Sequence, residues 1–421
     1  MRNSETSHIT ITPLMRTSLL LTSGIIIDKI AYGHIDTVWW LAASLFSWEL
    51  SLIHSRKQAN RVTTQCISIY FCIFCIGGLL TSHQEDKAQE ENIQIISQED
   101  LSSFDRALMN AQHIRSTASQ SLQHLGITDQ DFAVISAMTL GDKTALSRET
   151  KDIYSISGAS HVLAVSGLHI GIIFQLFILL MGGRRRSILA ISLSLIAIWG
   201  YIVFIGMPAS AVRSATMISI CSFALLAHKD AISLNNLSLA YIIMLLFNPL
   251  YLFDISFQMS FTAVFSIFLF APMIKDCFTA SGRITKWIWG MLCLSIAAQI
   301  GTMPLIIYYF GRISCYSLLT SFIAIPAATL ILYLSASTMF LALFTMVPYI
   351  TCLATPLLHF SARCLVSITQ ACNTALHLST LLPGASIEGI KLNIPQLCLI
   401  YISIIVGYLL LTRTLRRYHS R

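Results

Sequence analysis

Apolar runs near 20 residues long recur along most of this chain. A helix of about 20 such residues crosses the hydrocarbon core of a bilayer, which is roughly 30 Å thick. Because backbone polar groups must be satisfied inside the lipid, runs rich in Leu and Ile are expected to be helices rather than barrel strands. We place twelve membrane spans, within a range of 10–13, at residues 17–33, 37–53, 62–80, 158–181, 187–206, 209–228, 234–250, 255–274, 286–308, 314–345, 350–376 and 395–413.

Composition agrees with that pattern. Hydrophobic residues make up 55% of the 421 residues and charged residues 11%, whereas a soluble domain has about 25% charged residues. The predicted fold class is therefore an all-α polytopic integral membrane protein with one small helical extracytoplasmic segment. The span at 314–345 is too long for one straight crossing and contains Pro326, which predicts a kinked, re-entrant or divided helix.

Lysine and arginine in the short loops predict the orientation. They follow the second, fourth and eighth spans and recur in the final run R-T-L-R-R-Y-H-S-R, which all fall on one side under twelve spans. We therefore expect both termini in the cytoplasm. The expected parts are N-terminal spans (1–80), an outer helical segment (81–157), a core of spans (158–413) and a basic tail (414–421). The loop residues are Arg56, Lys57, Arg61, Arg184, Arg185, Arg186, Lys275, Arg283 and Lys286.

The outer segment is the one sizeable polar part of the sequence. Residues 81–152 hold twelve of the twenty acidic residues and six basic ones. Apolar residues recur at helical spacing from Leu101 to Leu125, and Gly126 follows as a stop signal. The stripe is thin, and a segment this short makes a poor core by itself. We expect it to pack on the membrane domain or on a partner, with a solvated connector as the alternative.

Residues 161–171 read H-V-L-A-V-S-G-L-H-I-G at the start of the fourth span. Ionisable groups at the edge of a span are costly, which makes them functional-site candidates. We expect Ser166 and Gly167 to break the helix so that its backbone faces water, with His161 and His169 near the outer mouth. Packing of polar atoms at a re-entrant bend is one alternative. An intramembrane hydrolase that uses Ser166 and His169 is another, although no third orienting acid lies near in sequence.

Polar side chains also interrupt other spans. Arg213 lies about five residues inside span six, where an arginine costs several kcal/mol unless it snorkels or meets a partner. Asp254 and Gln258 lie one turn apart at the start of span eight, and Gln299 lies deep in span nine. A polar stripe follows span eleven at His359, Arg363, Gln370 and Asn373.

For these polar positions, three purely structural roles are the alternatives. Arg213 and Asp254 could form a structural ion pair. The two glutamines could serve only as interhelical hydrogen-bond partners. The stripe of span eleven could belong to an amphipathic helix that lies in the membrane interface.

Several kinds of site have no support in the sequence. No H-x-H-x-D, H-E-x-x-H, Walker A or G-x-G-x-x-G pattern occurs, so neither a hydrolytic metal site nor a nucleotide-driven pump is indicated. We expect no cofactor, no metal and no enzymatic activity. The eleven cysteines, none of them within residues 81–157, do not indicate a disulfide framework.

The run at 161–171, preceded by L-G-D-K at 140–143, resembles the signature of the ComEC competence family of DNA-internalisation channels. P-A-S-A-V-R at 208–213 and D-I-S-F-Q-M-S-F-T-A-V at 254–264 resemble it too, in the family's order. The resemblance implies a bacterial multi-pass protein of the cytoplasmic (inner) membrane through which one strand of transforming DNA enters. Larger members often add an outer OB-like domain and a C-terminal metallo-β-lactamase-like domain. No pattern for either is visible here, so we expect a short member.

On this interpretation the chain is a passive channel for single-stranded DNA in natural competence. Arg213, Arg363 and His359 are expected to contact phosphates, while Gln258 and Gln299 offer neutral hydrogen bonds along the path, near Asp254. The expected partners are single-stranded DNA and the lipid bilayer. A separate nuclease, DNA-uptake machinery and a second copy of the chain are further candidates. A channel or transporter for another anionic polymer or solute is the alternative function.

Overall fold

The computed structural model of this protein describes most of the chain. The described residues are 12–31, 35–55, 62–91, 103–183, 187–227, 233–278, 281–345 and 351–419. Six of the basic loop residues used to predict the orientation lie outside the described residues; these are Arg56, Lys57, Arg61, Arg184, Arg185 and Arg186.

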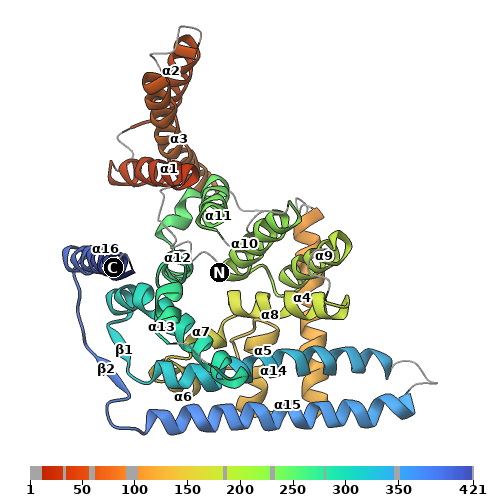
Figure 1. Cartoon of the computed structure of the whole chain (residues 1–421). Coiled ribbons are helices and arrows are strands. Elements are labelled where there is room, and N and C mark those ends of the chain that lie inside the picture. Colours follow the sequence, from red (N-terminus) through yellow and green to blue (C-terminus); the bar gives the residue numbers. More distant parts are fainter. Residues whose placement is uncertain are drawn as a thin grey trace. The chain divides into compact units, whose positions relative to one another are not determined.

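The described chain is almost entirely helical, which confirms the predicted all-α fold class (Figure 1). The first eight helices are α1 (Pro13–Ile30), α2 (Thr37–Ser55), α3 (Val62–Glu91), α4 (Ser103–His124), α5 (Asp129–Thr139), α6 (Arg148–Ile156), α7 (Ser160–Leu163) and α8 (Gly167–Leu180). The next eight are α9 (Ile188–Phe204), α10 (Ala209–Leu226), α11 (Leu234–Phe247), α12 (Ile255–Asp276), α13 (Arg283–Phe310), α14 (Ser317–Phe344), α15 (Thr351–Thr380) and α16 (Ile394–His419). A 3₁₀ turn, η3 (Pro249–Phe253), precedes α12, and the short strands β1 (Arg312–Ser314) and β2 (Ser386–Glu388) pair antiparallel.

Six of the described helices are long and apolar enough to cross a membrane, and each coincides with a predicted span. They are α3, α10, α12, α13, α14 and α16. Three shorter apolar helices, α8, α9 and α11, also coincide with predicted spans. The span at 314–345 is neither divided nor re-entrant: α14 runs unbroken through Pro326. The span at 158–181 is not one helix, because α7 ends at Leu163 and α8 begins at Gly167.

The chain forms two compact units. The first comprises Met1–Ala107, Arg186–Ile191 and Ala215–Gln258. In it α1 and α3 approach closely at two glycines: a Cβ on Gly24 would lie 2.0 Å from the Phe74 carbonyl oxygen, and one on Gly77 would lie 2.4 Å from that of Leu21. The contact therefore depends on glycine, as in other membrane helix pairs.

A buried polar pair joins α1 and α2 in this first unit. Asp28 is 2% exposed and accepts a 2.7 Å hydrogen bond from the Trp40 indole Nε1. This carboxyl group interrupts the first predicted span and was not among the predicted site residues. Because an unpaired carboxyl group is costly in lipid, the indole donor explains how α1 tolerates it.

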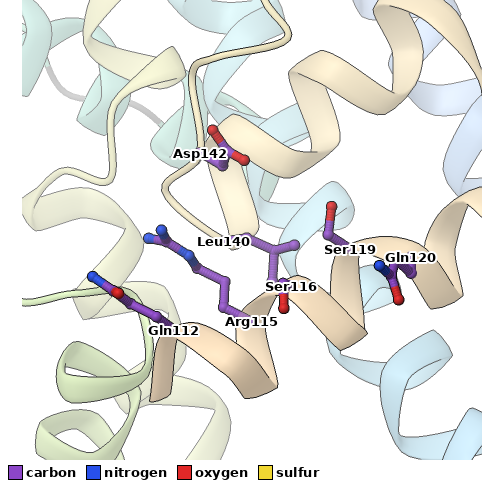
Figure 2. Close-up of a pocket in the computed structure, with 7 residues that line it drawn as sticks. All are labelled: Gln112, Arg115, Ser116, Ser119, Gln120, Leu140 and Asp142. Atoms are coloured by element: carbon purple, nitrogen blue, oxygen red, sulfur yellow. The ribbon is translucent and has the colours of Figure 1, made fainter. Parts of the chain in front are cut away.

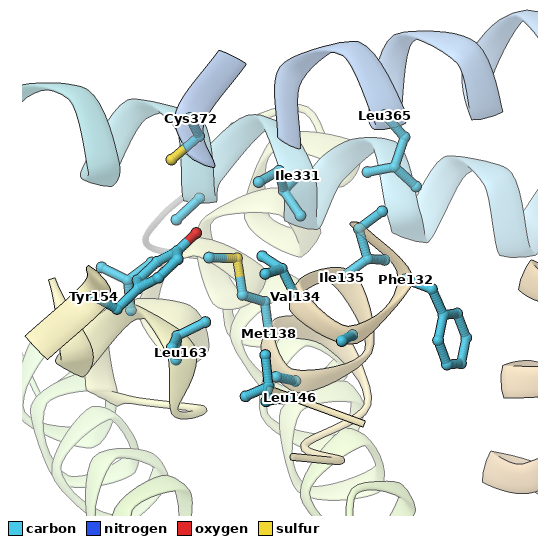
Figure 3. Close-up of a cluster of buried hydrophobic side chains, with 14 of the residues drawn as sticks. Phe132, Val134, Ile135, Met138, Leu146, Tyr154, Leu163, Ile331, Leu365 and Cys372 are labelled. Carbon is cyan, nitrogen blue, oxygen red and sulfur yellow. The ribbon is translucent and has the colours of Figure 1, made fainter. Parts of the chain in front are cut away.

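The second unit comprises Leu108–Arg185, Ser192–Ser214 and Met259–Arg421. Its apolar core is built where α5, α6 and α7 pack against α14 and α15 (Figure 3). Every residue of α5 from Phe132 to Thr139 is buried. Part of the predicted outer segment therefore packs on two helices of the predicted membrane core, whereas most of the α4 surface is exposed.

Candidate functional site

The break in the fourth predicted span is the centre of the candidate site. Ala164 and Ser166 adopt extended backbone conformations, and α8 starts immediately afterwards at Gly167. The Ser166 hydroxyl and His169 Nδ1 lie 2.9 Å apart, and the Ser166 backbone N–H donates to the same nitrogen at 3.4 Å. The amide bond is one half of a capping box, because the backbone N–H of His169 donates in return to the Ser166 side chain. A capping box satisfies amide groups that a helix start leaves open.

The ring of His169 is held in one orientation. Because Nδ1 accepts from the Ser166 amide, the neutral imidazole carries its proton on Nε2, an assignment that follows from the hydrogen bond. His169 is fully buried, and its Nε2 has no hydrogen-bond partner within the described part of the chain. The site therefore contains a buried N–H donor that an acceptor group or a water molecule would satisfy.

The first turn of α10 packs directly on the helix break. Ser210 Oγ donates a 2.6 Å hydrogen bond to the Val165 carbonyl oxygen, a group that the interrupted helix leaves without a helical partner. Gly167 allows the close approach, since a Cβ at this position would lie 2.7 Å from Ser214 Oγ. Arg213, on the same turn, is 1% exposed. The helix turn that satisfies the backbone of the break thus also carries a buried arginine.

A third stretch, at the end of α5, meets the same place. Tyr201 donates a 2.8 Å hydrogen bond from its hydroxyl to the Thr139 carbonyl oxygen. Gly141 has a φ of +73°, and a Cβ there would lie 3.6 Å from both the Ile205 carbonyl oxygen and Val165 Cγ2. The motif blocks at 140–143, 161–171 and 208–213 are therefore neighbours in space, although 64 residues lie between the first block and the third.

The carboxylate of Asp142 closes this turn. Its Oδ1 accepts from the Thr144 hydroxyl at 2.6 Å and from the Thr144 amide at 2.9 Å. The Thr144 hydroxyl is the main reason that the pKa of Asp142 lies below its ordinary value, with help from the Arg115 guanidinium. Asp142 is therefore charged at neutral pH.

The structure does not bring the other predicted residues into this group. Asp254 accepts from the Phe257 amide at 2.8 Å and caps α12, while Gln258 donates to the Leu252 carbonyl at 2.9 Å. Both belong to the first unit, so their part in a pathway and the pair of Arg213 with Asp254 stay predictions. Gln299 donates to Ser317 Oγ at 3.1 Å, which is the interhelical role considered from sequence. His161 Nδ1 lies 3.2 Å from the Gly158 carbonyl oxygen, one turn back.

The polar stripe of α15 divides into two parts. His359 and Arg363 lie on the exposed surface of the helix. Gln370 and Asn373 instead donate to the Asp131 carboxylate at 2.7 and 3.3 Å. The C-terminal half of the stripe, Gln370 and Asn373, is therefore a contact with α5. His359 and Arg363 remain the candidates for a polar path.

Sequence reasoning missed Ser210, Ser214 and Arg115. Two small residues four apart in an apolar helix are a known sign of close helix packing, so Ser210 and Ser214 could have been found. Arg115 gave no signal, because it lies on an exposed polar helix and meets the Ile205 carbonyl 90 positions away. Within the described residues, no group of three or more His, Cys, Asp or Glu side chains could hold a metal ion.

Comparison with known proteins places these motifs in a family. Residues 138–414 match the family described as "Competence protein". The chain is 31% identical over 217 residues to ComE operon protein 3 of Bacillus subtilis (strain 168), covering 48% of this chain and 27% of that protein. It is 30% identical over 166 residues to an uncharacterized protein of Aquifex aeolicus (strain VF5), covering 39% of this chain and 37% of that one. No solved structure matches the chain. The chain belongs to the competence protein family, the ComEC family that its motif blocks resemble.

Proposed function

We propose that this protein is a channel through which single-stranded DNA crosses the bacterial cytoplasmic membrane during natural competence. The family match over residues 138–414 supports a role in DNA uptake. The single observation that carries the channel mechanism is the broken helix at 164–166, where three motif blocks meet, one of which carries the buried Arg213. Irregular backbone is tolerated at membrane depth only where protein buries it or water reaches it.

The residues at the break suit passage of a polyanion. A moving phosphate needs charge and hydrogen bonds to replace its lost hydration, but too many fixed cations would stop it. Arg213 supplies one positive charge, and the Nε2–H of His169 supplies a neutral donor. A cation placed beside neutral donors favours transit over capture. His161, His359 and Arg363 extend this proposed path, and Gln258 and Gln299 offer further neutral contacts.

Ser166 and His169 belong in this proposal to the helix break rather than to catalysis. Two side chain–backbone bonds between them form a capping box at the start of α8, and the 2.9 Å contact of the hydroxyl with Nδ1 joins the same two residues. A hydrolase would also need a group that orients the histidine through its second nitrogen. Within the described residues, Nε2 has no such partner. A serine-reactive probe that labels the wild type and not Ser166→Ala would instead support hydrolysis.

Deletion of the gene tests the proposed function. In a strain that can be transformed, labelled DNA should still bind to the cell surface after deletion, while its entry into the cytoplasm should be lost. Plasmid-borne wild type should restore entry. Cytoplasmic entry that persists at the wild-type level would overturn the proposal and leave another anionic polymer or solute as the cargo. Loss of surface binding together with entry would argue for an earlier step than membrane passage.

The surroundings of the channel follow from the same proposal. We infer a multi-pass position in the inner membrane with both termini in the cytoplasm, the side that the basic tail favours. Its proposed partners are a nuclease that makes the strand single, the machinery that delivers DNA, and further copies of the chain.

A further inference from the structure

A polar pocket lies in the second unit, between α4 and the loop that follows α5. Its volume is about 250 Å³. Six of its seven lining residues are polar: Gln112, Arg115, Ser116, Ser119, Gln120 and Asp142, with Leu140 as the seventh. Figure 2 shows five of these side chains rising from α4 and the other two coming from the loop after α5. Five of the lining residues thus belong to α4, a helix that lies outside the matched residues 138–414, and the other two belong to the motif block at 140–143.

Arg115 connects the pocket to the candidate site. Its Nη1 donates a 3.2 Å hydrogen bond to the Ile205 carbonyl oxygen, in the loop that leads into α10. The same nitrogen would lie 3.5 Å from a Cβ at Gly206. Since a guanidinium has five N–H donors, one bond to a carbonyl leaves others for a ligand. The pocket is therefore joined by Arg115 to the loop that leads into α10.

The charge of α4 differs from that of the rest of the outer segment. Residues 106–128 contain no acidic residue, whereas residues 81–105 contain seven. Amide and hydroxyl side chains dominate the exposed face of α4 instead. Hydroxyls, amides and arginine are the groups that contact phosphate and sugar oxygens in nucleic acids. No aromatic ring lines the pocket, so nothing here stacks on a base.

We propose that this pocket holds one phosphate–sugar unit of single-stranded DNA on the outer side of the membrane, before the strand reaches the broken helix. This inference rests on the proposed function and names its first contact. The Arg115 guanidinium binds the phosphate, and Gln112, Ser119 and Gln120 hydrogen-bond to its oxygens or to the sugar. The Asp142 carboxylate opposes tight binding, because Thr144 holds it charged beside the arginine. Contact is therefore weak, independent of base sequence and sensitive to salt.

Binding to the whole protein in nanodiscs of uncharged lipid tests this proposal. Fluorescence anisotropy would follow an oligothymidine, an abasic strand of equal length and a strand with an uncharged methylphosphonate backbone. The abasic strand should bind as well as oligothymidine, and the methylphosphonate strand should not bind. Arg115→Gln should weaken oligothymidine binding about tenfold, the worth of one charge-assisted hydrogen bond. It should also reduce the slope of log affinity against log salt by about 0.7.

Arg148→Gln is the matched control. It removes the same charge from an exposed position of the same unit, away from the pocket. Equal effects of the two arginine variants would overturn the proposal, and so would a tenfold preference for oligothymidine over the abasic strand. Should Arg115→Gln accumulate poorly, Gln120→Glu adds a negative charge at an exposed lining position and should weaken binding similarly; unchanged binding would again overturn it.

Uptake assays on the same variants separate the two proposals. When gene deletion abolishes cytoplasmic entry but Arg115→Gln binds and imports DNA as the wild type does, only the pocket is refuted. When deletion leaves entry unchanged, the channel itself is refuted, whatever the pocket binds.

Discussion

Ser210 ties α10 to the broken helix by a 2.6 Å hydrogen bond from its hydroxyl to the Val165 carbonyl oxygen. The bond joins the extended segment before α8 to α10, the helix that carries Arg213. An interrupted membrane helix leaves such carbonyl groups unsatisfied, and small polar side chains of neighbouring helices commonly satisfy them. The position of Arg213 therefore depends on how closely α10 can approach residues 164–167.

Gly167→Ala should prevent that approach. The new methyl group would lie 2.7 Å from Ser214 Oγ, which is too close, so α10 should move away and DNA entry should fall. Adding Ser214→Ala should restore entry, because the nearest remaining atom, the Cβ at position 214, would be 3.5 Å away. Gly171→Ala is the control, since a Cβ there meets nothing within 4 Å. A double variant no better than Gly167→Ala would show that the contact is not what limits uptake.

Arg213→Ala separates a path role from a packing role. If the guanidinium contacts DNA, uptake should fall about tenfold at unchanged protein level, the worth of one charge-assisted hydrogen bond. Arg213→Lys should retain much of the activity, because a moving phosphate needs charge, whereas a bidentate pair needs the fork of the guanidinium. Uptake in transformed cells and membrane abundance by immunoblot measure the two effects. Disappearance of both variant proteins from the membrane would favour packing.

Much of the fold could be predicted because a membrane span is recognised from the length and apolarity of one continuous stretch of sequence. Length and apolarity alone place helices such as α10 and α16 to within a few residues. The interruption after Leu163 was also visible, because a serine, a glycine and two histidines stand in an apolar run. What the pattern could not tell is which helices meet. Ser210 and Val165 are 45 positions apart, and nothing in either local sequence indicates the bond.

The polar residues show the same limit more sharply. Gln370 and Asn373 lie in a stripe with Arg363, yet they bind Asp131, a residue more than 230 positions away. Periodicity identifies a shared face and does not identify its neighbour. The same holds for α5. The sequence predicts that the outer segment packs on the membrane domain or on a partner, but it does not indicate that α14 and α15 are the helices that α5 meets.

Tyr154→Phe should weaken the contact between α6 and α15. The hydroxyl of Tyr154, a residue 1% exposed, donates a 2.7 Å hydrogen bond to Asn373 Oδ1. Its loss should lower the free energy of unfolding by about 1 kcal/mol. Thermal unfolding of purified protein, followed by circular dichroism, measures the change. Asn373→Leu removes the same bond, so the double variant should lose less than the two single variants combined; strictly additive losses would contradict the assignment.

Thr144→Val should change how stability depends on acid. The Thr144 hydroxyl is the main cause of the lowered pKa of Asp142, with a further contribution from Arg115. A lowered pKa means that the charged carboxylate stabilises the fold above the ordinary pKa of the carboxyl group. This contribution is lost as the pH falls through the lower pKa of the folded protein.

Removal of the hydroxyl should therefore raise the pKa of Asp142 and reduce the stability that is lost on acidification. Melting temperatures measured from neutral to acidic pH would follow this, with Thr144→Ser as the control that keeps the hydroxyl donor. Asp142→Asn should abolish the same part of the pH dependence. A Thr144→Val profile parallel to that of the wild type would mean that another carboxyl group governs the acid response. Asp142 also lines the pocket beside Arg115. In a range of acidic pH, Asp142 of the Thr144→Val variant should be protonated while Asp142 of the wild type is still charged. Only in that range should the variant bind single-stranded DNA more tightly than the wild type.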